Sequence, residues 1–580
     1  MNQPAIRKSS GYEFGEFRVD ASRRVLLKAD QTISLTPRQF DTLLYLVENS
    51  DRMITKEELM KAIWADAFVE ENNLNQSVSA LRRALGERRG DNRYIVTVPG
   101  HGYRFAATVT RVSSSTHADI EASSIAVLPF KPLLENQRDE ALEFGMADSL
   151  IMRLSGSPDM IVRPLTSVRK FSGLDQDAQT AGRELKVESV LDGSIQRAGT
   201  RIRLSARLTN VADGRSLWVG TFDEEFTDVF TVQDAISERV AAALQLHLST
   251  ETRRELMKRY TDSPLAYELY LQGRFHWNRL IPTEVRKSIE FYEQAIAVDP
   301  HYALAYTGIA VAYVSLSIAN DEEPSESFTK AKDAVLMALT LDETLADAHA
   351  YLSFIHFWFD WDWAAAESEV QRAITLNANS AEAHRAYGIL LSQLGRYEEA
   401  IVEENRAREL DPLALITRTN EALVYYYAGE LSVAEEKLLA ALELEPNFWV
   451  ALLSLGKVSV AQGRYEEAVA QLTKAKHVSG GSAQPMSMLG YTSAVMGERE
   501  KAEEILQELQ SLAGRRYVPP YNFALVHNGL RNDHDVFKWL ERAHKGRDVL
   551  LAAFIKADPV WSRFRNDARY TDLLRRMKLL

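Results

Sequence analysis

A 34-residue repeat is the feature that most constrains how this chain can fold. One glycine recurs at this spacing, as do two alanines: Gly395, Gly429, Gly463 and Gly497; Ala400, Ala434, Ala468 and Ala502; Ala407, Ala441 and Ala475. The segments GRYEEAIVEENRARELDP (395–412) and GRYEEAVAQLTKAKHVSG (463–480) also match each other closely. A repeat of this length buries its apolar face only against its neighbours, so the period predicts an extended, all-helical array.

The placement of small residues within the period is typical of tetratricopeptide repeats. The small positions on the first helix are Gly388, Ala422, Gly456 and Gly490, and the prolines that end the second helix are Pro300, Pro412 and Pro446. Extending the frame gives further repeats that begin near residues 269, 303, 347 and 517. We therefore predict an all-α solenoid over residues 264–580, with about eight repeats and a terminal helix that covers the last apolar face.

The stacked first helices of such an array line a concave groove that commonly holds a peptide or a partner helix. We therefore expect a protein or peptide ligand in this groove, with self-association of the array as the alternative. The aromatic segment FWFDWDW (357–363) is more consistent with the core of a repeat than with a ligand site.

The charge of the chain is unevenly distributed. The whole chain has a net charge of −13, but residues 82–111 contain seven arginines and only two acids, Glu87 and Asp91, a local net charge of +5 (7 − 2). Phosphate contacts are short-ranged at physiological salt, so a local basic face on an acidic chain is compatible with DNA binding. A solvated, arginine-rich surface explains the same residues equally well.

Features that are absent from the sequence exclude some other classes of protein. The chain has no cysteine, so disulfides and thiolate metal sites are excluded. The sequence shows neither a secretory signal nor an uninterrupted apolar stretch of membrane-spanning length, so we expect a cytoplasmic protein without a membrane anchor.

Residues 11–110 combine short strands with three helices. YEFGEFRVD and RRVLLK alternate as strands around a turn at Asp20–Ser22, and ISLT follows as a further strand. Capping boxes begin helices at Thr36–Gln39 and at Thr55–Glu58, and Asn72 or Asn73 caps a third helix, NLNQSVSALRRALGE. The periodicity of this third helix predicts a buried stripe of Leu74, Val78, Leu81 and Leu85, and the polar residues lie largely away from it: Asn75, Gln76, Ser79, Arg82 and Arg83. A closing hairpin joins RYIVTV to YRFAATV.

A sheet, three helices and a closing hairpin describe an α+β winged helix-turn-helix domain. The segments LTPRQFDTLLYLVENSDRMITKEELMKAIW, NNLNQSVSALRRALGE and YIVTVPGHGYRF resemble the OmpR/PhoB class of DNA-binding domains over about 100 residues. The resemblance is closest to the CadC/ToxR-type branch, which joins this domain to a sensor other than a phosphorylatable receiver. No receiver precedes the domain here and no transmembrane segment follows it, so we expect neither phosphorelay control nor direct sensing at the envelope.

The resemblance implies that the third helix enters the major groove and that the hairpin, the wing, lies at the minor groove. Asn75, Gln76 and Ser79 suit base contacts, and Asn72 and Asn73 suit bases or phosphates. Further expected contacts are Arg82 and Arg83 with phosphate or guanine, Thr36 and Arg38 with phosphate, and His101, Gly102, Tyr103 and Arg104 on the wing, where Gly100 and Gly102 permit a tight turn.

Two aromatic residues of the hairpin can instead pack beneath it: packing and DNA contact are equal alternatives for Tyr103, and packing is favoured for Phe105. The loop 65–71 corresponds to the family's RNA-polymerase-contacting loop, although Glu70 and Glu71 can equally be solvated charges. Expected partners are double-stranded DNA, RNA polymerase and a second copy of the chain on DNA.

A polar linker, RVSSSTHADIEAS (111–123), precedes a middle region over residues 124–250 whose strands and helices alternate as in an α/β domain with a mixed sheet. The segments SIAVLPF, FGMADSLIMRLS, VLDGSIQRAGTRIRLSARLTNVADGRSLW and VQDAISERVAAAL resemble the TolB-like module that often precedes tetratricopeptide repeats in bacterial regulators. Sensor, dimerisation and spacer roles all stay open, and a small effector is one possible ligand.

The chain contains neither a G-x-x-x-x-G-K-[ST] loop nor an H-E-x-x-H motif, so we expect no enzymatic activity, metal or cofactor. The sequence therefore predicts a multidomain protein that binds specific DNA sequences as a transcription regulator and is controlled through its repeats. The alternative is an interaction scaffold whose winged helix binds protein instead of DNA.

Overall fold

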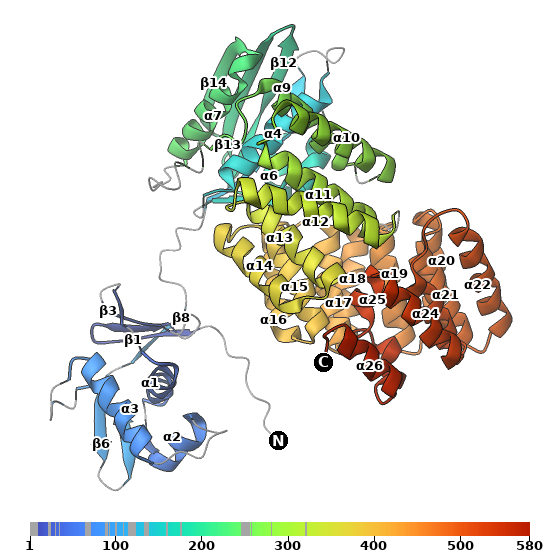
Figure 1. Ribbon diagram of the computed structural model, residues 1–580. Helices are drawn as coiled ribbons and strands as arrows, with labels where there is room; N and C mark the ends of the chain where they lie inside the picture. The colour runs from blue at the N-terminus through green and yellow to red at the C-terminus, as the bar shows by residue number, and fades with distance from the viewer. Residues whose placement is uncertain are drawn as a thin grey trace. The chain divides into compact units, whose positions relative to one another are not determined.

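The computed structural model divides the chain into two compact units, Met1–Glu121 and Ala122–Leu580 (Figure 1). The structure describes residues 10–20, 25–28, 31–33, 35–50, 52–63, 71–87, 91, 93–98, 101–107, 109–113, 123–132, 138–157, 160–173, 177–244, 254, 256, 258–279, 281–318 and 322–580.

The first unit has two small antiparallel sheets and three helices. One sheet has the order β4-β3-β2-β1-β8, with β1 (Ser10–Phe14), β2 (Phe17–Asp20), β3 (Val25–Lys28), β4 (Gln31–Ile33) and β8 (Thr110–Ser113). The other has the order β5-β7-β6, with β5 (Met53–Thr55), β6 (Ile95–Val98) and β7 (Gly102–Phe105). The helices are α1 (Pro37–Glu48), α2 (Lys56–Ile63) and α3 (Glu71–Ala84).

The core of the first unit joins these elements. Phe14 of β1 contacts Phe105 of β7 edge to face, with ring centroids 4.8 Å apart. The predicted apolar stripe of α3, Leu74, Val78, Leu81 and Leu85, is buried in the same core. The expected capping box also begins α1: the backbone N of Thr36 donates to Oε1 of Gln39 at 3.0 Å, and Gln39 N donates to Thr36 Oγ1 at 3.4 Å.

Three local expectations for the first unit differ from the structure. YEFGEFRVD is two strands, because Gly15 adopts a φ of 56° and turns the chain between β1 and β2. Helix α3 begins at Glu71, so Asn72 and Asn73 lie in its first turn and neither is the N-cap. Strand β8 pairs with β1 as far as Ser113, so the segment expected to be a linker from residue 111 begins inside a sheet. The expected turn at Asp20–Ser22 lies mostly outside the described residues.

The second unit begins with a mixed sheet, as the sequence predicts. Its order is β11-β9-β12-β13-β14, with β9 (Ser123–Val127), β11 (Met160–Val162), β12 (Ser189–Ala198), β13 (Arg201–Asn210) and β14 (Ser216–Glu225), and β10 (Lys131–Pro132) pairs with β12. The strands β11, β9 and β12 are parallel, and β12, β13 and β14 are antiparallel. The helices of this region are α4 (Glu140–Leu154), α5 (Leu165–Val168), α6 (Ala178–Leu185) and α7 (Val229–Ala243).

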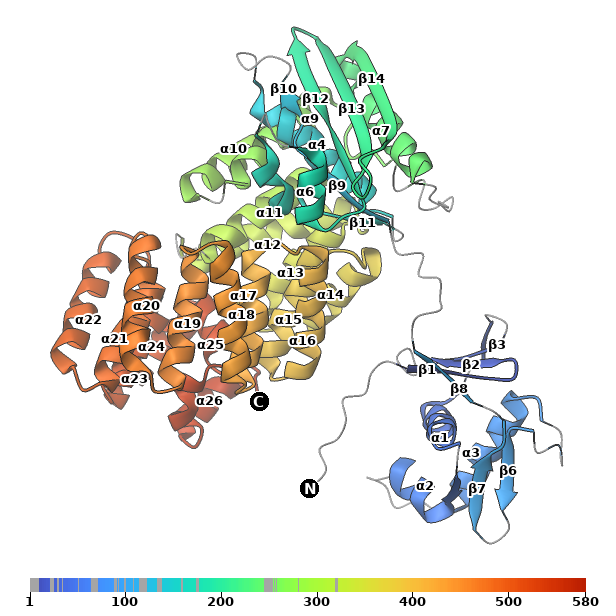
Figure 2. The ribbon, with the colours of Figure 1, turned by 180° about the vertical axis from the view of Figure 1, so that it is seen from behind.

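The described part of the repeat region forms eight antiparallel helix pairs (Figures 1 and 2). They are α9 (Pro264–Trp277) with α10 (Pro282–Val298), α11 (Ala303–Ile318) with α12 (Pro324–Leu341), α13 (Ala346–Ile355) with α14 (Trp363–Leu376), α15 (Ala381–Leu394) with α16 (Tyr397–Leu410), α17 (Leu415–Tyr427) with α18 (Leu431–Leu444), α19 (Trp449–Ala461) with α20 (Tyr465–Val478), α21 (Ala483–Val495) with α22 (Arg499–Ala513), and α23 (Pro520–Gly529) with α24 (Asp533–Lys545). Trp358, Trp361 and Trp363 of the aromatic segment are buried, as expected for a repeat core.

The middle sheet region docks onto the repeats through Arg163. Its guanidinium donates to the carbonyl oxygens of Leu185 and Lys186 at the end of α6, at 2.9 and 2.8 Å. It also donates to Glu409 O and Leu410 O at the end of α16, at 2.8 and 2.7 Å. A cation placed at the C-terminal ends of two helices satisfies exposed carbonyls and complements both helix dipoles. Arg163 therefore links the sheet region to the fourth helix pair by hydrogen bonds.

Residues 547–580, which we call the C-terminal tail, run across the first helices of several repeats. The tail contains α25 (Val549–Phe554), a 3-10 helix, η5 (Pro559–Phe564), and α26 (Ala568–Arg576), where the sequence predicted one terminal helix. Its side chains and backbone bond to α15, α17, α19 and α23 through the pairs Lys556–Leu394, Asp558–Tyr426, Asp558–Lys457 and Trp561–Tyr521. Both ribbon views place α25 beside α17 and α19. The tail thus occupies the concave side of the array, where we expected a peptide.

A carboxylic acid is buried within the fourth helix pair. Glu404 of α16 is fully buried, and neither carboxyl oxygen has a hydrogen-bond partner among the described residues. The corresponding positions one and two repeats later are Leu438 and Leu472, both also fully buried. Burial raises the pKa of Glu404 well above its ordinary value of 4.5, which favours the neutral acid in the folded state.

We expect Glu404→Leu to raise the free energy of unfolding by about 1–3 kcal/mol at neutral pH, because it removes an unsatisfied buried polar group. The folded state binds the Glu404 proton more tightly than the unfolded state, so wild-type stability falls as the pH rises above 4.5 and through the folded pKa. Over the same pH interval, the difference in free energy of unfolding between the leucine variant and the wild type should increase. Urea unfolding at several pH values measures both effects. Glu398→Leu, an exposed change on the same helix, is the control, and a less stable Glu404→Leu variant would contradict the expectation.

Candidate DNA interface

Helix α3 presents a polar face opposite its buried stripe. With about 100° of rotation per residue, positions 72, 76, 79 and 83 lie within about 60° of one another around the helix axis, on the side away from Leu74, Val78, Leu81 and Leu85. Ser79 and Arg83 are both exposed. The predicted residues Asn72, Gln76, Ser79 and Arg83 therefore share one face, while Asn73, Asn75 and Arg82 lie on its flanks.

The flank nearest the hairpin is tied to it by side-chain hydrogen bonds. Tyr103 OH donates to Oδ1 of Asn75 at 2.6 Å. Arg82 donates from Nε and Nη2 to Ile95 O at 3.2 and 2.7 Å, and from Nη2 to Thr97 Oγ1 at 2.8 Å. The guanidinium of Arg82 is thus directed at β6, where the sequence predicted a contact with DNA. These bonds support a positioning role for Arg82, and its contact with DNA stays a prediction. The neighbouring Arg83 is exposed.

Arg82→Met should loosen the attachment of α3 to β6 by about 1–3 kcal/mol, because three hydrogen bonds from a charged donor are lost while the apolar stem is kept. Hydrogen–deuterium exchange of the intact protein should show faster exchange at the amides of β6 and the second half of α3. Arg83→Met is the matched control, since the neighbouring guanidinium is exposed, and it should leave exchange unchanged. Equal exchange in both variants would show that Arg82 does not hold the helix.

The hairpin residues divide into a buried and an exposed set. Tyr103 is 4% exposed and Phe105 is 2% exposed, so both rings pack beneath the hairpin, and Tyr103 acts on Asn75 through its hydroxyl. His101 and Arg104 are exposed, as expected of residues that contact DNA. The burial of Tyr103 favours packing, and its contact with DNA stays a prediction.

Gly102 is required for a reason that the sequence did not reveal. We expected it to permit a tight turn, but a Cβ at this position would lie 2.0 Å from the carbonyl oxygen of Ile54 in the paired strand β5. The close approach of two backbones, and not the turn, excludes a side chain here. Gly100 lies outside the described residues.

Two residues that are predicted to contact phosphate lie at the N-terminus of α1, and both bond to other residues of this unit. Thr36 is exposed and forms the capping box with Gln39. Arg38 is also exposed, and its Nη1 donates to the carbonyl oxygen of Ile63, the last residue of α2. Arg38 therefore links the ends of two helices. Residues 65–70 of the expected RNA-polymerase-contacting loop (65–71), and also Arg88 and Arg89, lie outside the described residues.

Comparison with known families identifies two parts of the chain. Residues 30–105 match the family described as "Transcriptional regulatory protein, C terminal", and residues 355–414 and 419–483 match the family "Tetratricopeptide repeat". The first match spans β4 to β7, and so contains the α3 face and the hairpin.

Three curated proteins are similar to longer stretches. The chain is 24% identical over 416 residues to the transcriptional regulator HilA of Salmonella typhi, which covers 70% of this chain and 71% of that protein. It is 32% identical over 200 residues to a putative adenylate cyclase 3 of Rhizobium meliloti, covering 34% and 32%. It is 29% identical over 130 residues to the transcriptional activator CadC of Escherichia coli, covering 22% and 24%.

The structure and the comparisons agree on the two ends of the chain. The likeness of the middle region to a TolB-like module stays a prediction. None of the helices in the described part of the chain combines the length and the apolar content that a membrane crossing requires. The chain therefore carries an OmpR/PhoB-type winged-helix domain of transcriptional regulators and, further along, tetratricopeptide repeats, and it is similar to HilA over most of its length and to CadC over 130 residues.

Proposed function

We propose that this transcription regulator recognises specific double-stranded DNA by inserting α3 into the major groove and by laying the β6–β7 hairpin against the minor groove. The observation that carries the proposal is the single polar face of α3, on which positions 72, 76, 79 and 83 stand opposite the buried stripe. Amide, hydroxyl and guanidinium groups are those that read base edges and bind phosphates. The exposed His101 and Arg104 suit the hairpin's contacts with the DNA backbone.

The geometry also supports a division of the predicted residues into reading residues and supporting residues. Gln76, Ser79 and Arg83 are proposed to contact bases, with Asn72 and Asn73 at bases or phosphates near the start of the helix. Asn75 is held through its carbonyl oxygen by Tyr103, so a base contact by Asn75 uses its amide donor. Thr36 and Arg38 are proposed to bind phosphate.

Arg83→Ala is expected to weaken binding to the preferred site by about 1–3 kcal/mol if Arg83 reads a guanine, and to relax specificity at one base pair. Sites are first selected from random duplexes with the wild-type protein, and affinities are then measured at several salt concentrations. Arg83→Lys keeps the charge but not the bidentate fork, so it separates base reading from phosphate contact. If Arg83→Ala binds every probe as the wild type does, Arg83 is not at the interface.

The regulatory input is proposed to enter through the repeats. The C-terminal tail occupies the concave side from α15 to α23, so a peptide ligand has to displace the tail or use the outer surface. RNA polymerase and a second copy of the chain on DNA are further proposed partners. The regulator relatives and the repeats favour a non-enzymatic protein that acts where chromosomal DNA lies, in the cytoplasm.

A further inference from the structure

A polar pocket lies between the sheet region and the first helix pair. Its walls come from α4 and Arg138 just before that helix, from the segment around α5, and from the C-terminal end of α9, and we call it the α4–α9 pocket. It encloses about 280 Å³. Four arginines line it: Arg138, Arg169, Arg274 and Arg279. Since these residues come from three separate segments, no single stretch of sequence indicated the pocket.

The arginines outnumber the carboxylates in the lining. The two lining acids are Glu140 and Asp148, and Asp148 is buried in a bidentate pair with Arg274, with N–O distances of 2.5 and 2.9 Å. The opposite charges of Asp148 and Arg274 therefore neutralise each other. Three guanidinium groups, on Arg138, Arg169 and Arg279, then share the pocket with the single carboxylate of Glu140.

The partners of these three arginines leave donors available. Arg138 bonds the buried Glu143 through Nε at 3.1 Å, and the same Nε lies 3.7 Å from Glu140, so both Nη groups of Arg138 are outside these contacts. Arg279 bonds Glu284 through Nη1 at 3.0 Å and pairs with Glu140 through Nη2 at 3.5 Å, and Glu284 also accepts from Lys287 at 2.8 Å. Arg169 donates through Nη1 to a backbone carbonyl, that of Asn278, which carries no charge. Within the described residues the positive charge is therefore only partly compensated.

Two aromatic rings complete the lining. Phe144 of α4 and Phe275 of α9 have centroids 6.2 Å apart, and each ring is partly exposed. The guanidinium of Arg279 lies 4.5 Å from the centroid of Phe275. An apolar or aromatic group can pack against these rings while an attached anion meets the arginines.

We infer that the α4–α9 pocket binds a small phosphomonoester with an aromatic or apolar organic part. A phosphomonoester presents several acceptor oxygens in a tetrahedral arrangement, which suits guanidinium groups that approach from different elements. The anion contacts Arg138, Arg169 and Arg279, and the organic part packs against Phe144 and Phe275. Such a ligand bridges the sheet region and the first repeat, and it stabilises their joint by mass action.

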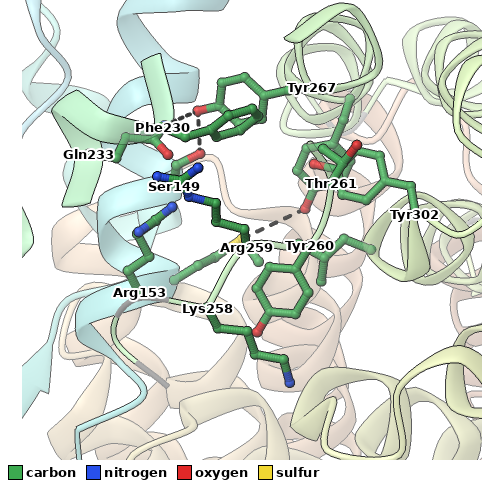
Figure 3. A pocket seen from close by; sticks show the side chains of 13 residues that line it. Ser149, Arg153, Phe230, Gln233, Lys258, Arg259, Tyr260, Thr261, Tyr267 and Tyr302 are labelled. Atoms are coloured by element: carbon green, nitrogen blue, oxygen red, sulfur yellow. Dashed lines mark hydrogen bonds between the residues drawn. The ribbon is translucent and has the colours of Figure 1, made fainter. Parts of the chain in front are cut away.

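A neighbouring pocket at the same joint does not suit an organic ligand (Figure 3). It encloses about 40 Å³, which is room for water only. Three of its polar groups also bond to one another, since Ser149 and Tyr267 share a hydrogen bond of 2.7 Å and Gln233 donates to Tyr267. The figure shows these three side chains pointing toward one another from the sheet region and from α9.

Isothermal titration of the intact protein tests the inference with four probes: phenyl phosphate, inorganic phosphate, phenol and benzoate. We expect phenyl phosphate to bind with a dissociation constant below about 1 mM and at least tenfold more tightly than each of the others. Arg169→Gln and Arg279→Gln should each weaken phenyl phosphate at least tenfold. Arg286→Gln, on the exposed side of α10 outside the pocket, should bind as the wild type does.

Four outcomes would overturn the inference. The first is that phenyl phosphate gives no heat of binding at about 10 mM, tenfold above the expected upper limit of its dissociation constant. The second and third are that inorganic phosphate or benzoate binds as tightly as phenyl phosphate does. The fourth is that Arg286→Gln weakens phenyl phosphate binding as much as Arg279→Gln does. Thermal unfolding of each variant without ligand shows whether its fold is intact. DNA binding is not part of the measurement, so the result is independent of the proposed function.

Discussion

Lys457→Met is expected to destabilise the repeat unit by about 3–5 kcal/mol, because it leaves a buried carboxylate without its counterion. Lys457 Nζ lies 2.9 Å from Oδ2 of Asp558, and both side chains are almost completely buried. The hydroxyl of Tyr426 donates to Oδ1 of Asp558 at 3.1 Å and would persist in the variant. It cannot replace the charge, since a neutral donor compensates only part of the cost of a buried anion.

Urea unfolding followed by circular dichroism measures this loss. The double variant Lys457→Met/Asp558→Asn removes both charges and keeps an acceptor for Tyr426, so it should recover at least half of the lost stability. Lys474→Met, an exposed lysine on α20, is the control and should change stability by less than about 0.5 kcal/mol. A double variant no more stable than Lys457→Met alone would show that the charge pair is not the cause.

Gly102→Ala is expected to separate β5 from β7 and to cost the first unit about 3–5 kcal/mol. The added Cβ would lie 2.0 Å from Ile54 O and 2.9 Å from Thr55 Cα, and both are backbone atoms that cannot rotate away. Displacing β7 also moves Tyr103, whose hydroxyl holds Asn75 of α3. We therefore expect the same change to weaken DNA binding although position 102 contributes no side chain.

Hydrogen–deuterium exchange at β5, β6 and β7 and affinity for the selected DNA site together measure this effect. Gly86→Ala is the matched control, because Gly86 has a φ of 71° and open space where the added methyl group would lie. It should cost only about 1 kcal/mol, the penalty for a side chain in the left-handed region. Equal losses in the two variants would mean that close backbone approach is not what selects glycine at 102.

The elements that the sequence predicted are those determined by local chemistry. The glycines at 34-residue spacing established the repeat, and in the structure they lie at the ends of first helices, where each adopts a φ between 76° and 86°. The capping box at Thr36 and the apolar stripe of α3 are similarly local signals, and both were confirmed. The polar face of α3 followed from the same periodicity.

The features that the sequence did not predict depend on residues brought together by the tertiary fold. The direction of Arg82 depends on the carbonyl of Ile95, which only the folded hairpin places beside α3. The requirement for Gly102 comes from the backbone of β5. The tail occupies the groove through pairs such as Lys457 with Asp558, which are 101 residues apart. A helical period relates only residues a few positions apart, so it cannot predict such a pair.

The C-terminal tail should make unfolding of the repeat array more cooperative. In a solenoid whose units touch only their neighbours, stability is close to a sum of local terms, and units can fray one by one from an end. Here Asp558 bonds to residues 101 and 132 positions earlier, and Met577 O accepts from Trp363, 214 positions earlier. Losing any helix pair between these anchors also releases the tail from the others. Six of the eight helix pairs should therefore melt in one cooperative transition, as a globular domain does.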